Sequence, residues 1–205
     1  MYGHFHNLEM LTACVNLKVL NLRGNKLEDI SELCHLHTLE ELNLSRNRIR
    51  DIIALNNLKN LRALNLSGNS LRDTSPLKSL VNLQHLVLIG YETNIVADLT
   101  GLIHLHTLII NSGNLNDITE LKNLQQLEYL NICGNAIQDI SCLTSLKKLK
   151  YLYLFDNPIN DYSPLLELHL EELIVGCGIT ERYPELVQFI PSSSLNYHSR
   201  CDIAF

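Results

Sequence analysis

Three histidine pairs of the form His-x-His are the residues best suited, by type and spacing, to bind a metal ion. In an extended segment such a pair places two imidazoles on one side. The pairs are His4/His6, His35/His37 and His104/His106. No nearby third ligand completes any pair, and the pairs lie far apart along the chain. The sequence therefore predicts solvated loop histidines, no metal site and no cofactor.

Other signatures of catalysis are also missing from the sequence. There is no GxxxxGK[ST], GxSxG or HExxH motif, so we expect no catalytic residue and no enzyme. The cysteines lie at Cys14, Cys34, Cys133, Cys142, Cys177 and Cys201. They form no CxxC pair and no compact disulfide framework, which favours reduced thiols. Met1–His6 lack a basic region followed by an apolar run, so we expect a protein of the cytoplasm or nucleus.

Composition indicates a folded chain whose core is built mainly from one residue type. The chain has 205 residues, 46% of them apolar, with 43 leucines, 9 glycines and no tryptophan. The formal net charge of −6 argues against a nucleic-acid partner, which requires a basic face. No stretch approaches the roughly 18 uncharged apolar residues that a membrane-spanning helix needs. A partner is therefore expected to be a protein.

The leucines recur with a period of 22 residues, so the elements that position any functional residue are repeated coils. One leucine column runs Leu17, Leu39, Leu61, Leu83, Leu105, Leu127 and Leu149, and Leu170 follows one residue early. Further aliphatic residues lie three and five positions after each of these. This alternation with period two predicts one short strand per coil.

Two polar columns follow each predicted strand. The first is Asn25, Asn47, Asn69, Asn135 and Asn157. The amides of these residues are expected to satisfy backbone groups inside the turns and to form a ladder between coils. The second column is Asp29, Asp51, Asp73, Asp117, Asp139 and Asp161. A carboxylate at this point is expected to accept backbone N–H bonds at the start of a single helical turn.

The resulting pattern LxxLxLxxNxIxDIxxLxxL resembles the 22-residue class of leucine-rich repeat. It is similar to the repeats of the leucine-rich regulatory subunit of protein phosphatase 1 and of bacterial internalins. The resemblance implies an α/β solenoid, a right-handed superhelix with a concave parallel sheet. Twenty-two residues leave room only for short 3₁₀ or helical turns on the convex side.

The whole chain, 1–205, is expected to form one such domain. Residues 1–16 match the second half of a coil and are expected to form an N-terminal cap, followed by about eight repeats of 21–22 residues over 17–180. In 181–205 we expect a helical cap and a tail, because Tyr183, Leu186, Val187 and Ile190 have the spacing of one helix face. The order of Tyr183, Pro191 and Leu195 is similar to the cap of intracellular eukaryotic leucine-rich repeat proteins, although Asn196-Tyr197 replaces the usual aspartate-glycine.

Strand alternation also predicts which side chains leave the concave face. In the first three coils these residues are mostly polar or small, but from the fourth coil onward they become aliphatic and aromatic. We name nine of these later residues the concave patch: Val87, Ile89, Ile109, Tyr129, Tyr151, Tyr153, Phe155, Glu172 and Ile174. Five coils at a strand spacing of about 4.8 Å carry the patch over roughly 19 Å. Exposed apolar patches rich in tyrosine are typical of protein interfaces.

Several functions fit this pattern. The first is a non-enzymatic scaffold or adaptor that binds a protein through the concave patch; the resemblance to the phosphatase subunit implies a phosphatase catalytic subunit as one such partner. The alternatives are a cytoskeletal or axonemal adaptor, a structural module that dimerises through the concave face instead of remaining monomeric, and an exported internalin-like adhesin. The tail, 192–205, with Leu195, Tyr197, Ile203 and Phe205, is a further candidate to cover the patch.

The fourth and fifth coils depart from the repeat. Tyr91 and Gly113 replace the asparagine, Thr93 replaces the aliphatic residue and Ile95 replaces the capping aspartate. Two interpretations remain open for residues 89–114. Either a loop bulges outward and contributes to recognition, or the solenoid changes curvature there.

Overall fold

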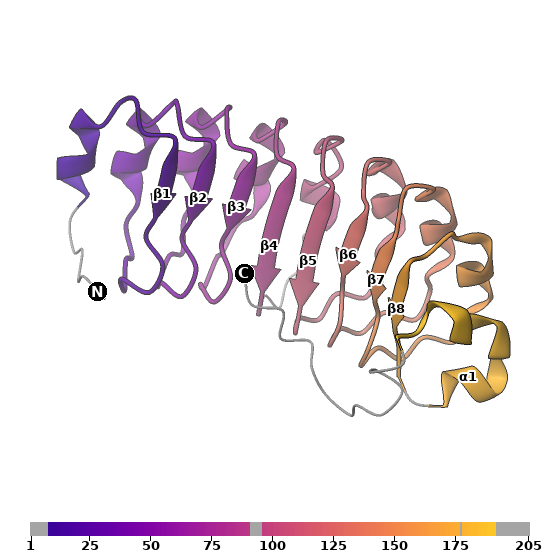
Figure 1. The fold of residues 1–205 in the computed structure, drawn as a ribbon. Coiled ribbons are helices and arrows are strands. Elements are labelled where there is room, and N and C mark those ends of the chain that lie inside the picture. Colours follow the sequence, from indigo (N-terminus) through magenta and orange to yellow (C-terminus); the bar gives the residue numbers. More distant parts are fainter. Residues whose placement is uncertain (1–7, 91–95, 177, 192–205) are drawn as a thin grey trace.

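The fold is an open parallel sheet built from one strand per coil (Figure 1). The computed structural model describes residues 8–90, 96–176 and 178–191. The strands are β1 (Val19–Asn21), β2 (Glu41–Asn43), β3 (Ala63–Asn65), β4 (His85–Ile89), β5 (Thr107–Asn111), β6 (Tyr129–Asn131), β7 (Tyr151–Tyr153) and β8 (Glu172–Ile174). They lie side by side in chain order, β1 to β8, which confirms the predicted solenoid.

The register follows the sequence period. Leu20 pairs with Leu42, so 22 residues separate the partners, and the same offset holds up to the pairing of β6 with β7. Leu152 pairs with Leu173 in the last pair, an offset of 21. The coil that ends at Leu170 is therefore one residue shorter than the others, and its strand still pairs with the preceding one.

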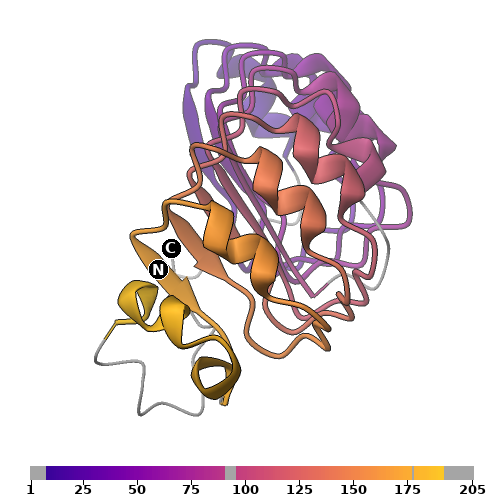
Figure 2. The ribbon, with the colours of Figure 1, turned by 90° about the vertical axis from the view of Figure 1, so that its right-hand side faces the viewer.

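Short 3₁₀ turns return each coil to the next strand on the opposite face of the sheet (Figure 2). They are η1 (Glu9–Ala13), η2 (Ser31–His35), η3 (Ile53–Asn57), η4 (Ser75–Ser79), η5 (Val96–Asp98), η6 (Thr119–Asn123), η7 (Ser141–Ser145) and η8 (Ser163–Glu167). The predicted aspartates begin these turns: Asp29 Oδ1 accepts the Ser31 N–H at 2.8 Å, and Asp161 Oδ1 accepts that of Ser163 at 2.9 Å.

The core lies between the sheet and these turns and consists of the stacked leucine columns. From Leu39 onward every member of the first column is at most 6% exposed, whereas Leu17 in the first coil is only partly buried. The predicted asparagine ladder forms at the edge of this core. Asn47 Oδ1 accepts the N–H groups of Asn25 and Leu27, both at 3.0 Å, and Asn47 Nδ2 donates to Leu22 O and Leu44 O.

The N-terminal cap repeats the geometry of the full coils. In η1 the N–H groups of Leu11 and Cys14 donate to Leu8 O and Leu11 O, both at 2.8 Å. The same pair of bonds closes η2, from Leu33 to Ile30 and from Leu36 to Leu33. Leu8 is buried and covers the first coil. Residues 1–7 of the predicted cap lie outside the described residues.

The C-terminal cap differs from the single helix face that the sequence indicates. Two short elements stand there, α1 (Ile179–Arg182) and η9 (Pro184–Phe189). Pro184 separates them because it lacks an N–H group and forces Tyr183 out of the helical region, to φ −131° and ψ 72°. Leu186 is buried as expected, but Val187 is 43% exposed.

The irregular coils carry the longest strands. β4 and β5 have five residues each and pair over their full length, from His85 with Thr107 to Ile89 with Asn111. The loss of the repeat residues is therefore accompanied by an extension of the sheet. Tyr91, Thr93 and Ile95 lie outside the described residues, so the choice between a bulge and a change of curvature remains a prediction.

Candidate functional site on the concave face

The concave patch lies on β4 to β8 and at the ends of these strands, on the face opposite the 3₁₀ turns. Its side chains alternate with buried core leucines: in β4, Leu86 and Leu88 are fully buried whereas Val87 and Ile89 are partly exposed. Eight of the nine patch residues are partly exposed. The exception is Ile109, which is 1% exposed and pairs with Val87 on one side and Asn131 on the other.

Three tyrosines form the centre of the patch. The ring of Tyr129 lies 5.1 Å from that of Tyr153 and 6.1 Å from that of Tyr151, measured between centroids. Two hydroxyl groups point to acidic residues of the last coil. Tyr153 Oη donates to Glu172 Oε1 and Tyr151 Oη donates to Glu171 Oε2, both at 2.8 Å. The sequence predicted that these tyrosines share the concave face, but it did not predict the hydrogen bonds that orient their rings.

The environment keeps these phenols neutral. Burial raises the pKa of Tyr129 and of Tyr153, and the hydrogen bond to Glu172 raises the pKa of Tyr153 further. The pKa of Tyr151 is raised mainly by its hydrogen bond to Glu171. A neutral phenol offers a flat apolar ring and a hydroxyl group, the combination that is enriched at protein interfaces. The three tyrosines of the patch present this combination of ring and hydroxyl group.

Polar side chains beside the tyrosines are more buried than the sequence indicates. Strand alternation places Asn111, Asn131 and Cys133 on the concave face, yet they are 3%, 0% and 1% exposed. Asn131 Oδ1 accepts the Cys133 N–H at 3.2 Å. Within the described residues, Asn131 Nδ2 and Tyr129 Oη are buried without a hydrogen bond of standard geometry. Burial of such groups costs free energy unless another group pairs with them.

The N-terminal half of the same face is an open groove with a volume of about 480 Å³. Its floor carries Asn21, Asn43 and Asn65, and each of these side chains accepts the backbone N–H two residues further on at 3.0 Å. His85 and Thr107 form its far end, with Nδ1 and Oγ1 3.0 Å apart. Burial lowers the pKa of His85. The sequence showed polar residues here but not the hollow between them.

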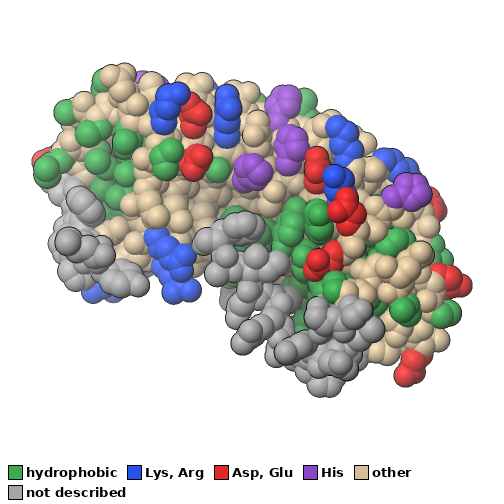
Figure 3. Space-filling view, in the orientation of Figure 1, with side chains coloured by type: hydrophobic (Ala, Val, Ile, Leu, Met, Phe, Trp, Pro, Cys, Tyr) green, Lys and Arg blue, Asp and Glu red, His purple; other side chains and the backbone are tan. Residues whose placement is uncertain are grey.

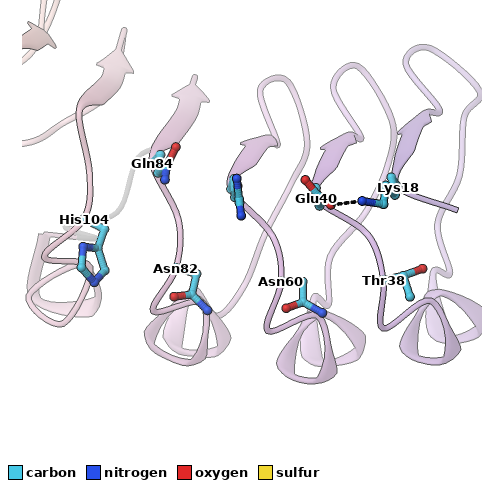
Figure 4. A pocket seen from close by; sticks show the side chains of 8 residues that line it. Lys18, Thr38, Glu40, Asn60, Asn82, Gln84 and His104 are labelled. Carbon is cyan, nitrogen blue, oxygen red and sulfur yellow. Dashed lines mark hydrogen bonds and ion pairs between the residues drawn. The ribbon is translucent and has the colours of Figure 1, made fainter. Parts of the chain in front are cut away.

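A second cavity of about 580 Å³ follows the edge where strands β1 to β4 begin (Figure 4). Its side chains hold adjacent coils together. Thr38 donates to Val15 O at 2.7 Å, Asn60 to His37 O at 2.8 Å and Asn82 to Lys59 O at 2.9 Å. Lys18 Nζ pairs with Glu40 Oε1 at 2.8 Å, and this hydrogen bond lowers the pKa of Glu40. Figure 3 shows charged side chains along this edge. The side chains that line this edge cavity therefore have a structural role.

Metal ligands, membrane-spanning helices and cysteines can be judged in the parts of the chain that the structure describes. Among these residues no three His, Cys, Asp or Glu side chains are grouped to hold a metal ion, and no helix is long and apolar enough to cross a membrane. Cys14, Cys34, Cys133 and Cys142 are not in disulfides, and burial raises the pKa of Cys142 to about 11, so that it remains a thiol. His4, His6, Cys177 and Cys201 lie outside the described residues.

Comparison with known proteins identifies the repeat. A family model described as leucine-rich repeats, two copies, matches residues 15–60, 37–79, 59–104 and 125–167. No curated protein sequence matches the chain.

Among solved structures, internalin C2 of Listeria monocytogenes is 32% identical with a TM-score of 0.77, over 84% of this chain and 78% of that one. The internalin inlF of the same organism is 27% identical with a TM-score of 0.80, over 98% of this chain and 65% of that one. The ectodomain of the plant receptor kinase GASSHO1/SCHENGEN3 from Arabidopsis thaliana shares the fold, at 22% identity with a TM-score of 0.64, over 82% of this chain and 22% of that one.

These matches agree with the register and the ladders seen in the structure. They support a protein-interaction module of the internalin type of repeat, and the similarity to the phosphatase regulatory subunit stays a prediction from the sequence. The chain belongs to the leucine-rich repeat family.

Proposed function

We propose that this protein is a scaffold or adaptor that binds a protein partner through the concave patch. The cluster of Tyr129, Tyr151 and Tyr153 carries the proposal. Only 6% of the residues in the chain are aromatic. Nevertheless, these three tyrosine rings lie against each other on neighbouring strands, at positions where the repeat needs no aromatic side chain. Their rings are partly exposed, so they can enter an interface as anchors.

The surroundings of the tyrosines favour a partner with basic side chains. Glu171 and Glu172 accept the tyrosine hydroxyls, and Glu128 lies near Lys150 on the same edge. Lys150 is 3.6 Å from Glu128 and 3.7 Å from Glu171, so one cation serves two carboxylates. A Lys or Arg from the partner would supply the missing positive charge and steer association.

The test removes the aromatic anchors and compares the result with a matched loss of apolar surface elsewhere. Tyr153→Ala with Phe155→Ala is expected to weaken partner capture by tenfold or more, since interface anchors contribute about 2 kcal/mol or more each. The control is Ile53→Ala with Ile103→Ala, two residues that are 66% and 53% exposed and lie outside the patch. Retention of every partner by a folded Tyr153/Phe155 variant would overturn the proposal.

Dimerisation through the same face is distinguished by sedimentation at micromolar concentration. We expect a monomer, because the scaffold function requires a free concave patch. A dimer that the Tyr153→Ala, Phe155→Ala variant dissociates would replace the scaffold by a homo-oligomeric module. The phosphatase version of the scaffold and the cytoskeletal adaptor rest on the sequence alone.

A second candidate function is an exported adhesin, which the similarity to internalin C2 favours. The absence of disulfides at the four described cysteines supports instead a reducing compartment, the cytoplasm or nucleus. Protease treatment of intact cells separates the two. An intracellular scaffold stays protected until the cells are lysed, whereas a surface adhesin is cut at once.

A further inference from the structure

The open groove over β1 to β3 contains a row of oriented amide groups. Asn21 pairs with Asn43, and Asn43 pairs with Asn65, so the three side chains form one column across adjacent strands. Each Oδ1 atom accepts the backbone N–H two residues further on, which fixes the orientation of the amide. Among the residues that the structure describes, none of the three Nδ2 groups donates a hydrogen bond. Three amide donors therefore remain for a ligand, at a spacing of about 4.8 Å.

The rest of the groove is mainly aliphatic. Val19 and Ala63 lie beside the asparagine column, and Val87 continues this column on β4. Val19 is 58% exposed, and the other two are partly exposed. At the far end of the groove, His85 and Thr107 hydrogen-bond to each other. A ligand that fits the groove must therefore present several acceptors in a line, together with compact apolar groups.

We propose that this groove binds a proline-rich peptide segment in the polyproline II conformation. This helix has three residues per turn and rises about 3.1 Å per residue, so carbonyl groups on one side recur every 9.3 Å or about two strand spacings. The carbonyl groups of ligand residues i and i+3 can therefore accept from Asn21 and Asn65 at the same time. A fully extended strand repeats on one side about every 6.7 Å, which matches neither one nor two strand spacings.

Proline also suits the balance of donors and acceptors in the groove. Among the described residues that line it, Glu41 alone carries a carboxylate, and the amide oxygens already accept backbone N–H groups. A proline residue has no N–H group, so its burial leaves no donor without an acceptor. Its ring can pack against the aliphatic side chains. Proline-rich segments hold this conformation before they bind, so they lose little conformational entropy on binding.

The length of the groove sets the length of the segment. The lining residues extend from Val19 on β1 to Thr107 on β5, which is four strand spacings or about 19 Å (Figure 1). Six residues of polyproline II cover about the same length. The inference goes beyond the proposed function, because among the described residues the groove shares only Val87 with the concave patch.

The test titrates the full chain into a fluorescein-labelled peptide of nine prolines and follows fluorescence anisotropy. Asn43→Asp with Asn65→Asp is expected to weaken binding tenfold or more. Each aspartate keeps the oxygen that accepts the strand-end N–H and replaces the Nδ2 donor by an acceptor, which repels a carbonyl group. The matched control, Asn116→Asp with Gln138→Glu, adds the same charge at exposed residues outside the groove and should bind like the parent.

Two further peptides test the conformation of the ligand. A labelled nonapeptide of alternating glycine and serine has similar carbonyl groups but must be ordered on binding, so it should bind at least tenfold more weakly. A labelled peptide of three prolines cannot reach both Asn21 and Asn65 and should also bind weakly. Equal affinity for the nine-proline and glycine-serine peptides would overturn the proposal, as would unchanged binding by the folded double aspartate variant.

Circular dichroism shows whether the double aspartate variant is folded. If it is not, Ala63→Phe takes its place, because a ring at this partly exposed position fills the groove and should abolish binding of the nine-proline peptide. The Tyr153→Ala, Phe155→Ala variant should bind this peptide like the parent. Loss of peptide binding in that variant would move the peptide to the concave patch and overturn the proposal. Loss of partner capture with intact peptide binding would overturn the proposed function alone.

Discussion

The two halves of the concave face have the same backbone arrangement but differ in the side chains that point outward from the strands. Over β1 to β3 the outward side chains are small or polar, each asparagine accepts a hydrogen bond from its own strand end, and a groove of about 480 Å³ remains open. Over β5 to β7 tyrosines and aliphatic residues occupy equivalent positions, and Ile109, Asn131 and Cys133 are buried between partly exposed tyrosines. The difference shows that the repeat specifies the scaffold, and on the proposed function specificity is set by positions that the repeat leaves variable.

Stability and function are therefore carried by different columns. The leucine and asparagine columns stack in both halves and make the same contacts in each. The outward column changes from Asn43 and Asn65 to Ile109, Asn131 and Tyr153 without any change in strand register. Substitutions in the first set should act on unfolding, and those in the second set should act on binding.

The largest effect is expected from breaking the asparagine ladder in the regular half. Asn47→Ala removes hydrogen bonds to the N–H groups of Asn25 and Leu27 and to Leu22 O and Leu44 O. Leu22 O and Leu44 O keep Asn25 Nδ2 and Asn69 Nδ2 as donors, but the backbone N–H groups of Asn25 and Leu27 lose the amide oxygen that accepts from them inside the core. The free energy of unfolding should therefore fall by about 3 kcal/mol. Asn157 is partly exposed at the end of the ladder, so Asn157→Ala should cost about half as much. Urea denaturation measures both values, and equal losses would contradict this ranking.

The second prediction tests whether Ile109 on the concave face is buried in solution. Ile109→Ala should lower the free energy of unfolding by about 2–3 kcal/mol, because Ile109 is 1% exposed and its truncation leaves a cavity. Val19→Ala in the open half removes a side chain that is 58% exposed and should cost less than about 0.5 kcal/mol. A small loss for Ile109→Ala would show that solvent reaches β5.

The fold was predictable because its signal is redundant. The sequence pattern of each strand, turn and capping aspartate recurs in several coils. A replaced residue in one coil therefore does not hide the period. The residues of the candidate site, in contrast, do not recur from coil to coil. The alternation placed Tyr129, Tyr151 and Tyr153 on one face, as the structure shows them.

Burial on that face could not be predicted in the same way. Local alternation tells which way Ile109 and Asn131 point, but it does not tell what lies above them. Pro184 indicated that the C-terminal cap is divided into two short elements. The helical spacing of the apolar residues around it favoured a single helix instead, and that prediction was wrong.

The third prediction concerns alkali and distinguishes the two halves by their tyrosines. Residues 8–90 contain no tyrosine, whereas burial raises the pKa of Tyr129 and Tyr153 in the other half. Folded protein thus holds protons that the unfolded chain releases above a pH of about 10, so the contribution of these two phenols to the free energy of unfolding should be constant below that pH and fall above it.

The slope of this fall should stay below the limit of about 1.4 kcal/mol per pH unit for each phenol, because solvent reaches both rings. Tyr129→Phe with Tyr153→Phe should flatten it, and denaturation at pH 9 to 11 measures the difference. The same slope in parent and variant would mean that neither phenol is protected in the folded protein.

The smallest effect comes from a column of left-handed residues that follows the strands in both halves. Its members are Gly24, Arg46, Gly68, Gly90, Ser112, Gly134 and Asp156, with φ between 56° and 83°. A side chain in this conformation costs about 1 kcal/mol or more, partly offset by the greater freedom of glycine in the unfolded chain. Ser112→Gly and Asp156→Gly should therefore raise the free energy of unfolding by about 0.5 kcal/mol each.

Gly68→Ala is the reverse substitution and isolates the strain of the backbone. The added Cβ would meet its nearest neighbour, Arg46 Cα, at an ordinary contact of 3.6 Å, so no clash contributes. A loss of about 1 kcal/mol is expected from the φ of +66° alone. Thermal and urea denaturation of Gly68→Ala and Asp156→Gly should give opposite signs. The same sign for both would show that the turns of the two halves, despite their common dihedral angles, are not held in the same way.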